Sequence, residues 1–317
     1  MNRGGSTKSW YIMAWLCFVS LWSSLPAHAF GEEGHALTCR VAWRALAPET
    51  KIWVKGILQS RRRSAFEAAC TWPDGPGREH PAYSWLWPLH YVGVPLDAPA
   101  PARKDHCAKR GCILSALPRF HRTLMNPNAT AGDQVLALRM LVHLIADIHL
   151  PVHIAHSDGR GGTMTRVRVQ SRASALTEKE LNTQGEPASL SSDVLSSMVW
   201  NEHMLWDSGY LVAWMNDAKK REEFLASLPV EATARRMGPA QVQEWASESF
   251  AIAKRQDLFA TDKSTPISQA QVDAATEVVL GRIEDAGIRI AETLNDLAKT
   301  HAKLQRASTE VQAPIRK

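Results

Sequence analysis

Ionisable residues interrupt an apolar stretch of the chain, Val142 to His153, which reads VHLIADIHLPVH. Aliphatic residues dominate it, as in the buried core of a helix, yet His143, Asp147, His149 and His153 stand among them. Ionisable side chains are costly to bury unless they are paired or bind a metal ion. Because residues four apart share a helix face, His143 and Asp147 predict a polar site inside a helical core.

Pro151 sets the end of this helix. Proline disfavours helical geometry at the residue before it, so the helix should stop near His149. A turn would then bring His153 back toward the site. His149 lies roughly 240° around the helix from His143 and should face elsewhere.

A second histidine–aspartate pair with the same spacing, His203 and Asp207, occurs in NEHMLWDSG. Helical bundles build metal sites in their cores from such side chains on facing helices. Imidazole nitrogens and carboxylate oxygens are ligands that suit zinc. An isolated pair would more often be a surface ion pair, so the prediction depends on the combination.

Helical periodicity extends over most of the chain and predicts an all-α fold, a single large domain with a metal cluster in a central cleft. Helices are expected within residues 34–48, 48–63, 132–149, 192–214, 238–259 and 268–304. Alternating valines in TMTRVRVQ predict one short β-hairpin arm at residues 163–170. Residues 71–111 should be irregular, residues 171–192 an exposed loop insertion, and residues 305–317 a flexible tail.

The first residues have the features of a secretory signal peptide. Basic residues precede an apolar run from Trp10 to Trp22, and small residues follow at Ala27 and Ala29. The run is too short to span a bilayer comfortably. We expect residues 1–29 to be removed, leaving a secreted or periplasmic protein that begins at Phe30.

Four cysteines remain after this cleavage, namely Cys39, Cys70, Cys107 and Cys112. An even number in an exported chain predicts two disulfides, for which three pairings are possible. The short separation favours Cys107 with Cys112, which leaves Cys39 with Cys70. The formal net charge of +5 falls to +3 without the two basic residues of the signal segment, so charge alone is weak evidence for a nucleic-acid partner.

Taken together, the motifs resemble those of the secreted trinuclear-zinc nucleases specific for single strands, the mung-bean-nuclease type. The shared motifs are FGEEGH at Phe30, CTWPD with Asp74, PLHYVG with His90, the pattern H-x-x-x-D-x-H-x-P-x-H, SDGRGG, the second histidine–aspartate pair, WASES and DAGIRIAETLN. The resemblance runs from Phe30 to about Asn295. This superfamily also includes bacterial zinc phospholipase C.

The resemblance implies three zinc ions, one of them held partly by the α-amino nitrogen and carbonyl oxygen of Phe30. The implied ligands are Asp74, His90, His143 and Asp147 for one ion, His153, His203 and Asp207 for another, and Phe30, His35 and Asp147 for the third. His149 and Asp158 resemble supporting residues that orient ligands. Asp74 would also orient a water molecule or accept a proton from it.

Several positions depart from the family pattern. The family places an arginine three residues after its first aspartate, where this chain has Gly77, and Arg78 is assigned its catalytic role. Phe30 replaces a tryptophan, and Thr163 replaces an asparagine. Ser208 replaces a base-contacting asparagine and is assigned to substrate binding, as is Tyr91, on which a splayed base would stack.

The expected function is hydrolysis of single-stranded DNA and RNA to 5′-phosphorylated products, with 3′-nucleotidase activity, by a monomer without an obligate protein partner. Zinc would lower the pKa of a water nucleophile and stabilise the departing 3′ oxygen. One alternative is a zinc phospholipase C acting on phosphatidylcholine. That family has Glu at the position of Asp207, which favours the nuclease. A non-catalytic periplasmic zinc-binding protein is the other alternative.

Overall fold

The computed structural model describes residues 31–170, 195–196, 199–260 and 265–312. The predicted signal peptide (1–29), Phe30 and the predicted loop insertion (171–192) lie outside these residues. The described part is all-α with one two-stranded sheet, which confirms the predicted fold class. None of the helices described is both long and apolar enough to cross a membrane.

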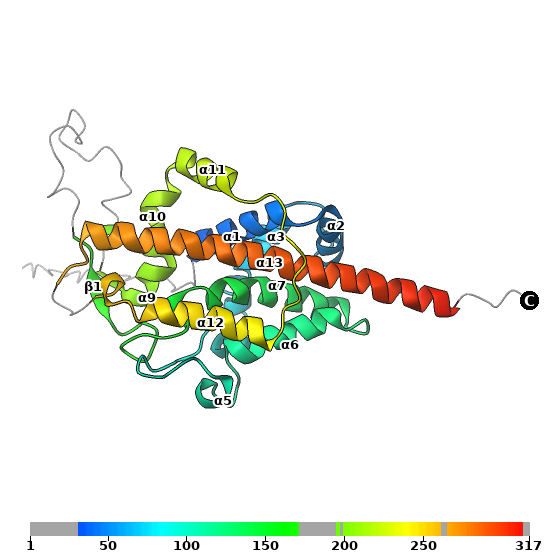
Figure 1. The fold of residues 1–317 in the computed structure, drawn as a ribbon, viewed down its shortest axis with the longest axis horizontal. Coiled ribbons are helices and arrows are strands. Elements are labelled where there is room, and N and C mark those ends of the chain that lie inside the picture. Colours follow the sequence, from blue (N-terminus) through cyan, green and yellow to red (C-terminus); the bar gives the residue numbers. More distant parts are fainter. Residues whose placement is uncertain (1–30, 171–194, 197–198, 261–264, 313–317) are drawn as a thin grey trace, which may run out of the picture.

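Figure 1 shows how the helices and the two strands are arranged. They are α1 (Gly31–Ala45), α2 (Pro48–Ile57), α3 (Ser64–Thr71), α4 (Pro76–Glu79), η1 (Pro81–Leu89), α5 (Arg103–His106), α6 (Ile113–Met125), α7 (Ala131–Ile148), η2 (Pro151–His153), β1 (Arg166–Arg168), β2 (Val199–Asn201), α9 (Glu202–Met204), η5 (Leu205–Gly209), α10 (Tyr210–Met215), α11 (Ala218–Ser227), α12 (Pro239–Ala253), η6 (Gln256–Leu258) and α13 (Gln269–Gln312). The segment 71–111 contains only short helical turns, as its composition predicted.

Helix α7 is the centre of the molecule. Every residue from Met140 to Ile148 is buried, because α7 packs against α6, α3, α12 and α13. In Figure 1, α13 lies across α1, with α7, α12 and α6 packed below it. The helix ends at Ile148 and the 3₁₀ turn η2 follows, as Pro151 predicted.

Two disulfides tie the first third of the chain together. Cys39 on α1 bonds to Cys70 on α3, and Cys107 bonds to Cys112 just before α6. Both predicted pairings are therefore confirmed. The first bridge fixes α3 against α1 four residues before Asp74.

The sequence prediction was wrong at two places. Val199–Asn201 lies in the stretch expected to be helical but forms β2, antiparallel to β1 with Trp200 opposite Val167. The strand depends on its distant partner β1, against which Trp200 is buried between more exposed neighbours. The Asn201 side chain then caps α9 by accepting from the Met204 N–H. Helix α13 also continues past residue 304 to Gln312. Residues 305–313 contain neither glycine nor proline, and the next proline is Pro314.

A charged network joins the end of α7 to α12 and α13. Arg282 on α13 donates to the carbonyl of His149, to Ser249 Oγ and to Glu248 Oε2, the last at 2.8 Å. Arg289 donates to both oxygens of Glu248, at 2.6 and 2.7 Å. Since a partly buried carboxylate is shared by two guanidinium groups, this network fixes the last turn of α7.

We expect the substitution Arg282→Met to lower the free energy of unfolding by about 2–3 kcal/mol, because it leaves the carbonyl of His149 without its side-chain donor and removes one of the two guanidinium groups that pair with Glu248. Urea denaturation followed by circular dichroism measures this loss. The control is Arg255→Met, which removes an exposed ion pair with Asp257 and should cost under about 0.5 kcal/mol. Equal losses in the two variants would contradict the structural role of the network.

Candidate metal centre

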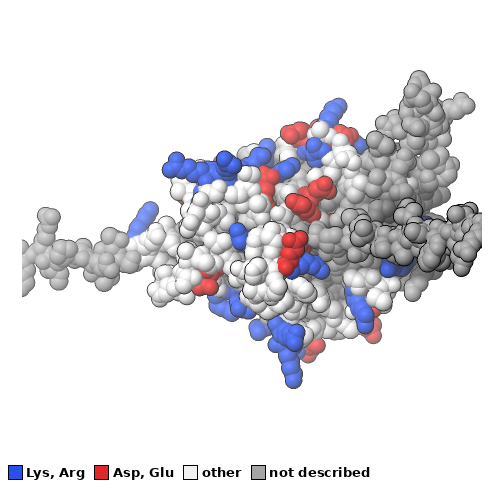
Figure 2. Space-filling view, turned by 180° about the vertical axis from the view of Figure 1, so that it is seen from behind, with Lys and Arg blue, Asp and Glu red and all other residues white. Residues whose placement is uncertain are grey.

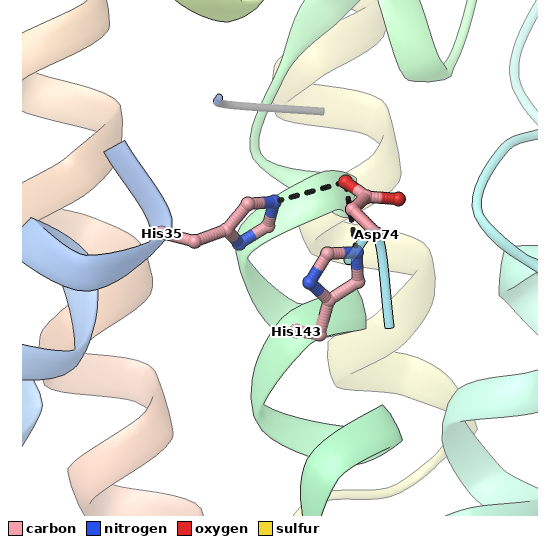
Figure 3. A group of neighbouring side chains, drawn as sticks. All are labelled: His35, Asp74 and His143. Atoms are coloured by element: carbon pink, nitrogen blue, oxygen red, sulfur yellow. Dashed lines mark ion pairs between the residues drawn. The ribbon is translucent and has the colours of Figure 1, made fainter. Parts of the chain in front are cut away.

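Three elements bring His35, Asp74 and His143 together in the interior. His35 lies one turn into α1, Asp74 lies in the turn between α3 and α4, and His143 lies on α7. Figure 3 shows both rings directed at the carboxylate, with His35 Nε2 3.9 Å and His143 Nε2 3.5 Å from Asp74 Oδ2. The two rings also stack, with centroids 3.9 Å apart. All three side chains are buried, so this is a polar pocket in a closed interior.

Asp147 connects this group to a second one. Its Oδ1 lies 3.4 Å from His35 Nε2, and its Oδ2 lies 3.3 Å from His143 Nε2. His90, at the end of η1, places Nδ1 3.0 Å from Asp147 Oδ2 and 3.6 Å from Asp74 Oδ1. His90, His143 and Asp147 thus have ligand atoms close enough to bind one ion together.

The third group combines η2 with the segment that follows β2. His153 Nε2 lies 3.4 Å from Asp207 Oδ1, and His203 Nε2 lies 3.1 Å from Asp207 Oδ2. His203 is on α9 and Asp207 on the π-helical turn η5, which keeps their four-residue spacing on one face. His153 has returned to the site after Pro151, as the sequence predicted.

Backbone carbonyls determine which ring nitrogens face the carboxylates. The Nδ1 atoms of His143, His153 and His203 lie 2.7, 2.8 and 2.7 Å from the carbonyl oxygens of Cys70, His90 and Gly161. A carbonyl only accepts, so each Nδ1 carries the proton and donates it. In the neutral ring, each Nε2 therefore points its lone pair at a carboxylate oxygen, an arrangement that requires a cation between them.

The electrostatics of the cation-free centre agree with this geometry. Burial lowers the pKa of His143, but Asp147 and Asp74 outweigh it and raise that pKa to about 9. Burial likewise lowers the pKa of His153, and Asp147 and Asp207 raise it to about 9. Burial raises the pKa of Asp147, yet His143 and His153 bring it well below its ordinary value. A bound cation would replace these protons, so metal binding should release them.

Two buried carboxylates, Asp147 and Asp207, test whether these residues could hold a metal ion. Asp147 and Asp207 are completely buried, and their four oxygens accept no hydrogen bond of good geometry within the described residues. Buried polar atoms are nearly always satisfied in native proteins. Three groups of neutral nitrogen and anionic oxygen donors are what Zn²⁺ coordinates, and the fit is good.

A cavity of about 530 Å³ opens onto this centre, and Asp74, His90, His153 and His203 form part of its wall. Arg78, assigned from sequence to catalysis, lines it and places Nη1 3.7 Å from Asp74 Oδ1. Tyr91 lines it with half of its surface exposed. The second predicted substrate contact, Ser208, is not in the wall of this cavity but lies against Gly31, where any side chain would collide with Ser208 Oγ.

The packing around Gly77 is too tight for a side chain. A Cβ at Gly77 would lie 2.7 Å from the Trp72 ring and 2.9 Å from its carbonyl oxygen. The tight packing of Trp72 under α4 therefore excludes a side chain at Gly77, the position where the resemblance had implied an arginine. The next residue, Arg78, faces Asp74 instead.

The two predicted supporting residues differ in what they contact. His149 Nδ1 donates to the Ile145 carbonyl, and its Nε2 accepts from Arg289, so it supports the end of α7 and does not orient a ligand directly. Asp158 accepts from the backbone N–H groups of Arg160, Gly162 and Met164. The loop thus held includes Gly161, whose carbonyl orients His203.

Sequence reasoning missed His156 and Glu202. Glu202 is completely buried and its Oε2 lies 2.8 Å from His156 Nε2, while the Ala260 N–H donates to Oε1. Burial lowers the pKa of His156, but Glu202 outweighs it and raises the value. His156 and Glu202 are 46 residues apart, so helix or strand periodicity could not predict that they pair. It holds the cavity wall directly beside His203.

Asp158→Asn should weaken the most loosely bound metal ion about 10-fold, because the amide nitrogen cannot accept the hydrogen bonds that anchor the Gly161 carbonyl. Competition with a chromogenic zinc chelator measures this affinity. Burial raises the pKa of Asp158, but the Gly162, Arg160 and Met164 N–H groups lower it to about 2. The stabilisation by the Asp158 carboxylate is therefore complete at pH values above 3.8, the ordinary pKa of aspartate. It is lost as the pH falls through about 2, the pKa of Asp158 in the folded protein.

Thr163→Val is the matched control for this loop, since Thr163 bonds only to the exposed Arg160 carbonyl. It should leave the metal affinity unchanged. An equal weakening in both variants would mean that general disturbance of the loop, and not the Asp158 anchor, controls the site.

Comparison with known proteins agrees with this geometry. Residues 30–299 match the profile of the S1/P1 Nuclease family. The chain is 25% identical to Endonuclease 3 of Arabidopsis thaliana over 305 residues, which covers 94% of this chain and 99% of that protein. It is 30% identical to Nuclease P1 of Penicillium citrinum over 127 residues, 39% of this chain and 47% of that enzyme. The chain therefore belongs to the S1/P1 nuclease family of phosphodiester-hydrolysing enzymes.

Proposed function

We propose that this protein is a zinc-dependent endonuclease that hydrolyses single-stranded DNA and RNA to 5′-phosphorylated products and also removes the phosphate of 3′-mononucleotides. The observation that carries the proposal is the convergence of three histidine–aspartate groups at the wall of one cavity, in a member of a nuclease family. Phosphodiester hydrolysis needs charge neutralisation and an activated water at the same point, and adjacent metal sites supply both.

Three zinc ions would be held by nine residues in this proposal. They are Asp74, His90, His143 and Asp147 for the first, His153, His203 and Asp207 for the second, and His35, Asp147 and the terminal amine and carbonyl of Phe30 for the third. The two free oxygens of Asp147 support its bridging role, since each faces a different histidine. The role of Phe30 depends on removal of the signal peptide, which would create the amine next to α1.

When bound, zinc would acidify a coordinated water and neutralise phosphate charge. The residues of the chain supply the rest of the chemistry. Asp74 lies at the cavity wall and would orient the attacking water or accept its proton. Arg78 would donate hydrogen bonds to the non-bridging phosphate oxygens, where negative charge increases in the transition state.

Preference for single strands would come from aromatic stacking. Tyr91 follows His90 directly, and Trp87 also lines the cavity with nearly half of its surface exposed. A base must leave a duplex before it can stack on such a ring, and an unpaired base does so at lower cost. Trp87 would therefore join Tyr91 as a substrate contact.

The proposal includes the maturation of the protein. The family match from residue 30 supports a catalytic domain at 30–304 after a signal peptide at 1–29. Two disulfides support export to an oxidising compartment, either outside the cell or the periplasm. The enzyme would act as a monomer without an obligate protein partner.

A parallel assay of purified mature enzyme tests this function. Denatured DNA, RNA and 3′-AMP should be hydrolysed, duplex DNA should be cut at least 100-fold more slowly, and phosphatidylcholine should be inert. The same preparation should contain three zinc ions per chain by metal analysis. Turnover of lipid without turnover of nucleotides would establish the phospholipase instead, and metal without any turnover would establish a non-catalytic zinc protein.

Arg78→Gln should reduce kcat on denatured DNA about 100-fold, or roughly 3 kcal/mol, because it removes a charged donor aimed at the reacting phosphate. Zinc content should not change. Arg78→Lys should recover part of the loss, and Arg103→Gln, at an exposed arginine on α5, should have no effect on kcat. Normal kcat in Arg78→Gln would exclude Arg78 from catalysis.

A further inference from the structure

We propose that a second cavity, lined in part by Trp72, binds a phosphate-bearing anion, with Arg139 as its main contact. This cavity has a volume of about 320 Å³ and is lined by Arg139, Trp72, Tyr83, Gln59, Gly132 and Val135, among others. It shares no lining residue with the large cavity. We call it the Arg139 cavity. Only the nature of its ligand depends on the proposed function.

Arg139 lies in this cavity without a charged partner. It is four residues before His143 on α7, and its guanidinium carbon lies 4.6 Å from the centre of the Trp72 ring. Among the described residues it has no ion pair and no hydrogen bond, and its Nε is buried. Stacking on Trp72 satisfies the face of the guanidinium but none of its N–H donors.

The charge of Arg139 is also partly removed from water. Burial lowers the pKa of Arg139 and outweighs the opposing effect of Tyr83. A desolvated cation without an anion is a cost to the folded protein. An oxyanion in the cavity would remove this cost and satisfy the in-plane donors, and phosphate suits the planar fork of a guanidinium.

The other walls suit a ligand with a flat apolar part. Tyr83 and Trp72 meet edge to face with centroids 5.0 Å apart, and Val135 adds an aliphatic side. Gly132 and Val135 lie on the same side of the helix α7 as Arg139, so one flank of this helix forms a wall of the cavity. A nucleoside monophosphate combines an anion with a flat ring, and the proposed reaction produces one.

Two exposed arginines closely follow a lining residue of the Arg139 cavity in the chain. Gln59 lines it with φ at 49°, a left-handed turn that ends α2 just before the exposed arginines Arg61 and Arg62. Neither has a carboxylate partner within the described residues, whereas Arg63 pairs with Glu67. Figure 2 shows Lys and Arg gathered at the upper left, toward the end of the molecule that holds α2. This arginine run would attract an anion to the cavity.

Equilibrium dialysis of 5′-AMP against the mature, metal-loaded enzyme at low salt tests the proposal. The probe is a product of the proposed reaction, so it should persist and also occupy the metal centre. We expect two bound molecules per chain in the wild type. Arg139→Gln should weaken the second site at least tenfold, and Arg139→Lys should weaken it less. Thermal unfolding of each variant checks that the fold is retained.

Arg44→Gln is the matched control, because Arg44 is a partly buried arginine with an unpartnered Nε that lines none of these cavities. It should retain both sites. One bound molecule in the wild type, unchanged binding in Arg139→Gln, or an equal loss in Arg44→Gln would each overturn the proposal.

Two further probes, inorganic phosphate and adenosine, show which part of the nucleotide the cavity binds. Inorganic phosphate that binds with the same dependence on Arg139 would show that the phosphate group suffices, whereas binding of 5′-AMP alone would show that the nucleoside contributes. Adenosine carries no phosphate, so its binding should not depend on Arg139, and adenosine that binds the cavity as tightly as 5′-AMP would overturn the anion site. Because dialysis does not require turnover, failure of the proposed nuclease activity would leave this result interpretable on its own.

Discussion

The structure depends on one constraint, which is that two carboxylates, Asp147 and Asp207, are buried in a helical interior. Neither has any exposed surface, and neither oxygen pair accepts a well-formed hydrogen bond among the described residues. Such a charge is stable only if cations stand close to it. Histidine nitrogens at 3.0 to 3.4 Å surround these oxygens, and protons or metal ions supply the positive charge.

The scaffold supports this centre through contacts that do not involve the ligand atoms. Carbonyl oxygens of Cys70, His90 and Gly161 each hold the far nitrogen of one histidine. The first of these carbonyls belongs to a disulfide-bonded residue, and the last belongs to a loop anchored by Asp158. The orientation of these three histidine rings therefore depends on the positions of backbone carbonyls. A substitution at Asp158 could disturb the carbonyl of Gly161 without touching a ligand atom.

Much of the site could be predicted from spacing because helix geometry links near neighbours. The pairs His143–Asp147 and His203–Asp207 lie together for that reason, and Pro151 accounts for the return of His153. The prediction failed where distant segments decide the outcome. Val199–Asn201 became a strand because β1 was available to pair with it, and Ser208 packs against Gly31 outside the cavity wall.

By itself, the sequence determined the helical class through its periodicity, and it favoured the disulfide pairing that the structure contains. The proposed metal ligands came from helical spacing together with the resemblance to a nuclease family. Only the tertiary structure decided which groups share a cavity. It showed that Trp72 excludes a side chain at Gly77 and so brings Arg78 to face Asp74. It also paired His156 with Glu202 and stacked Arg139 on Trp72 with no carboxylate partner among the described residues, since contacts between segments far apart in the chain obey no local spacing.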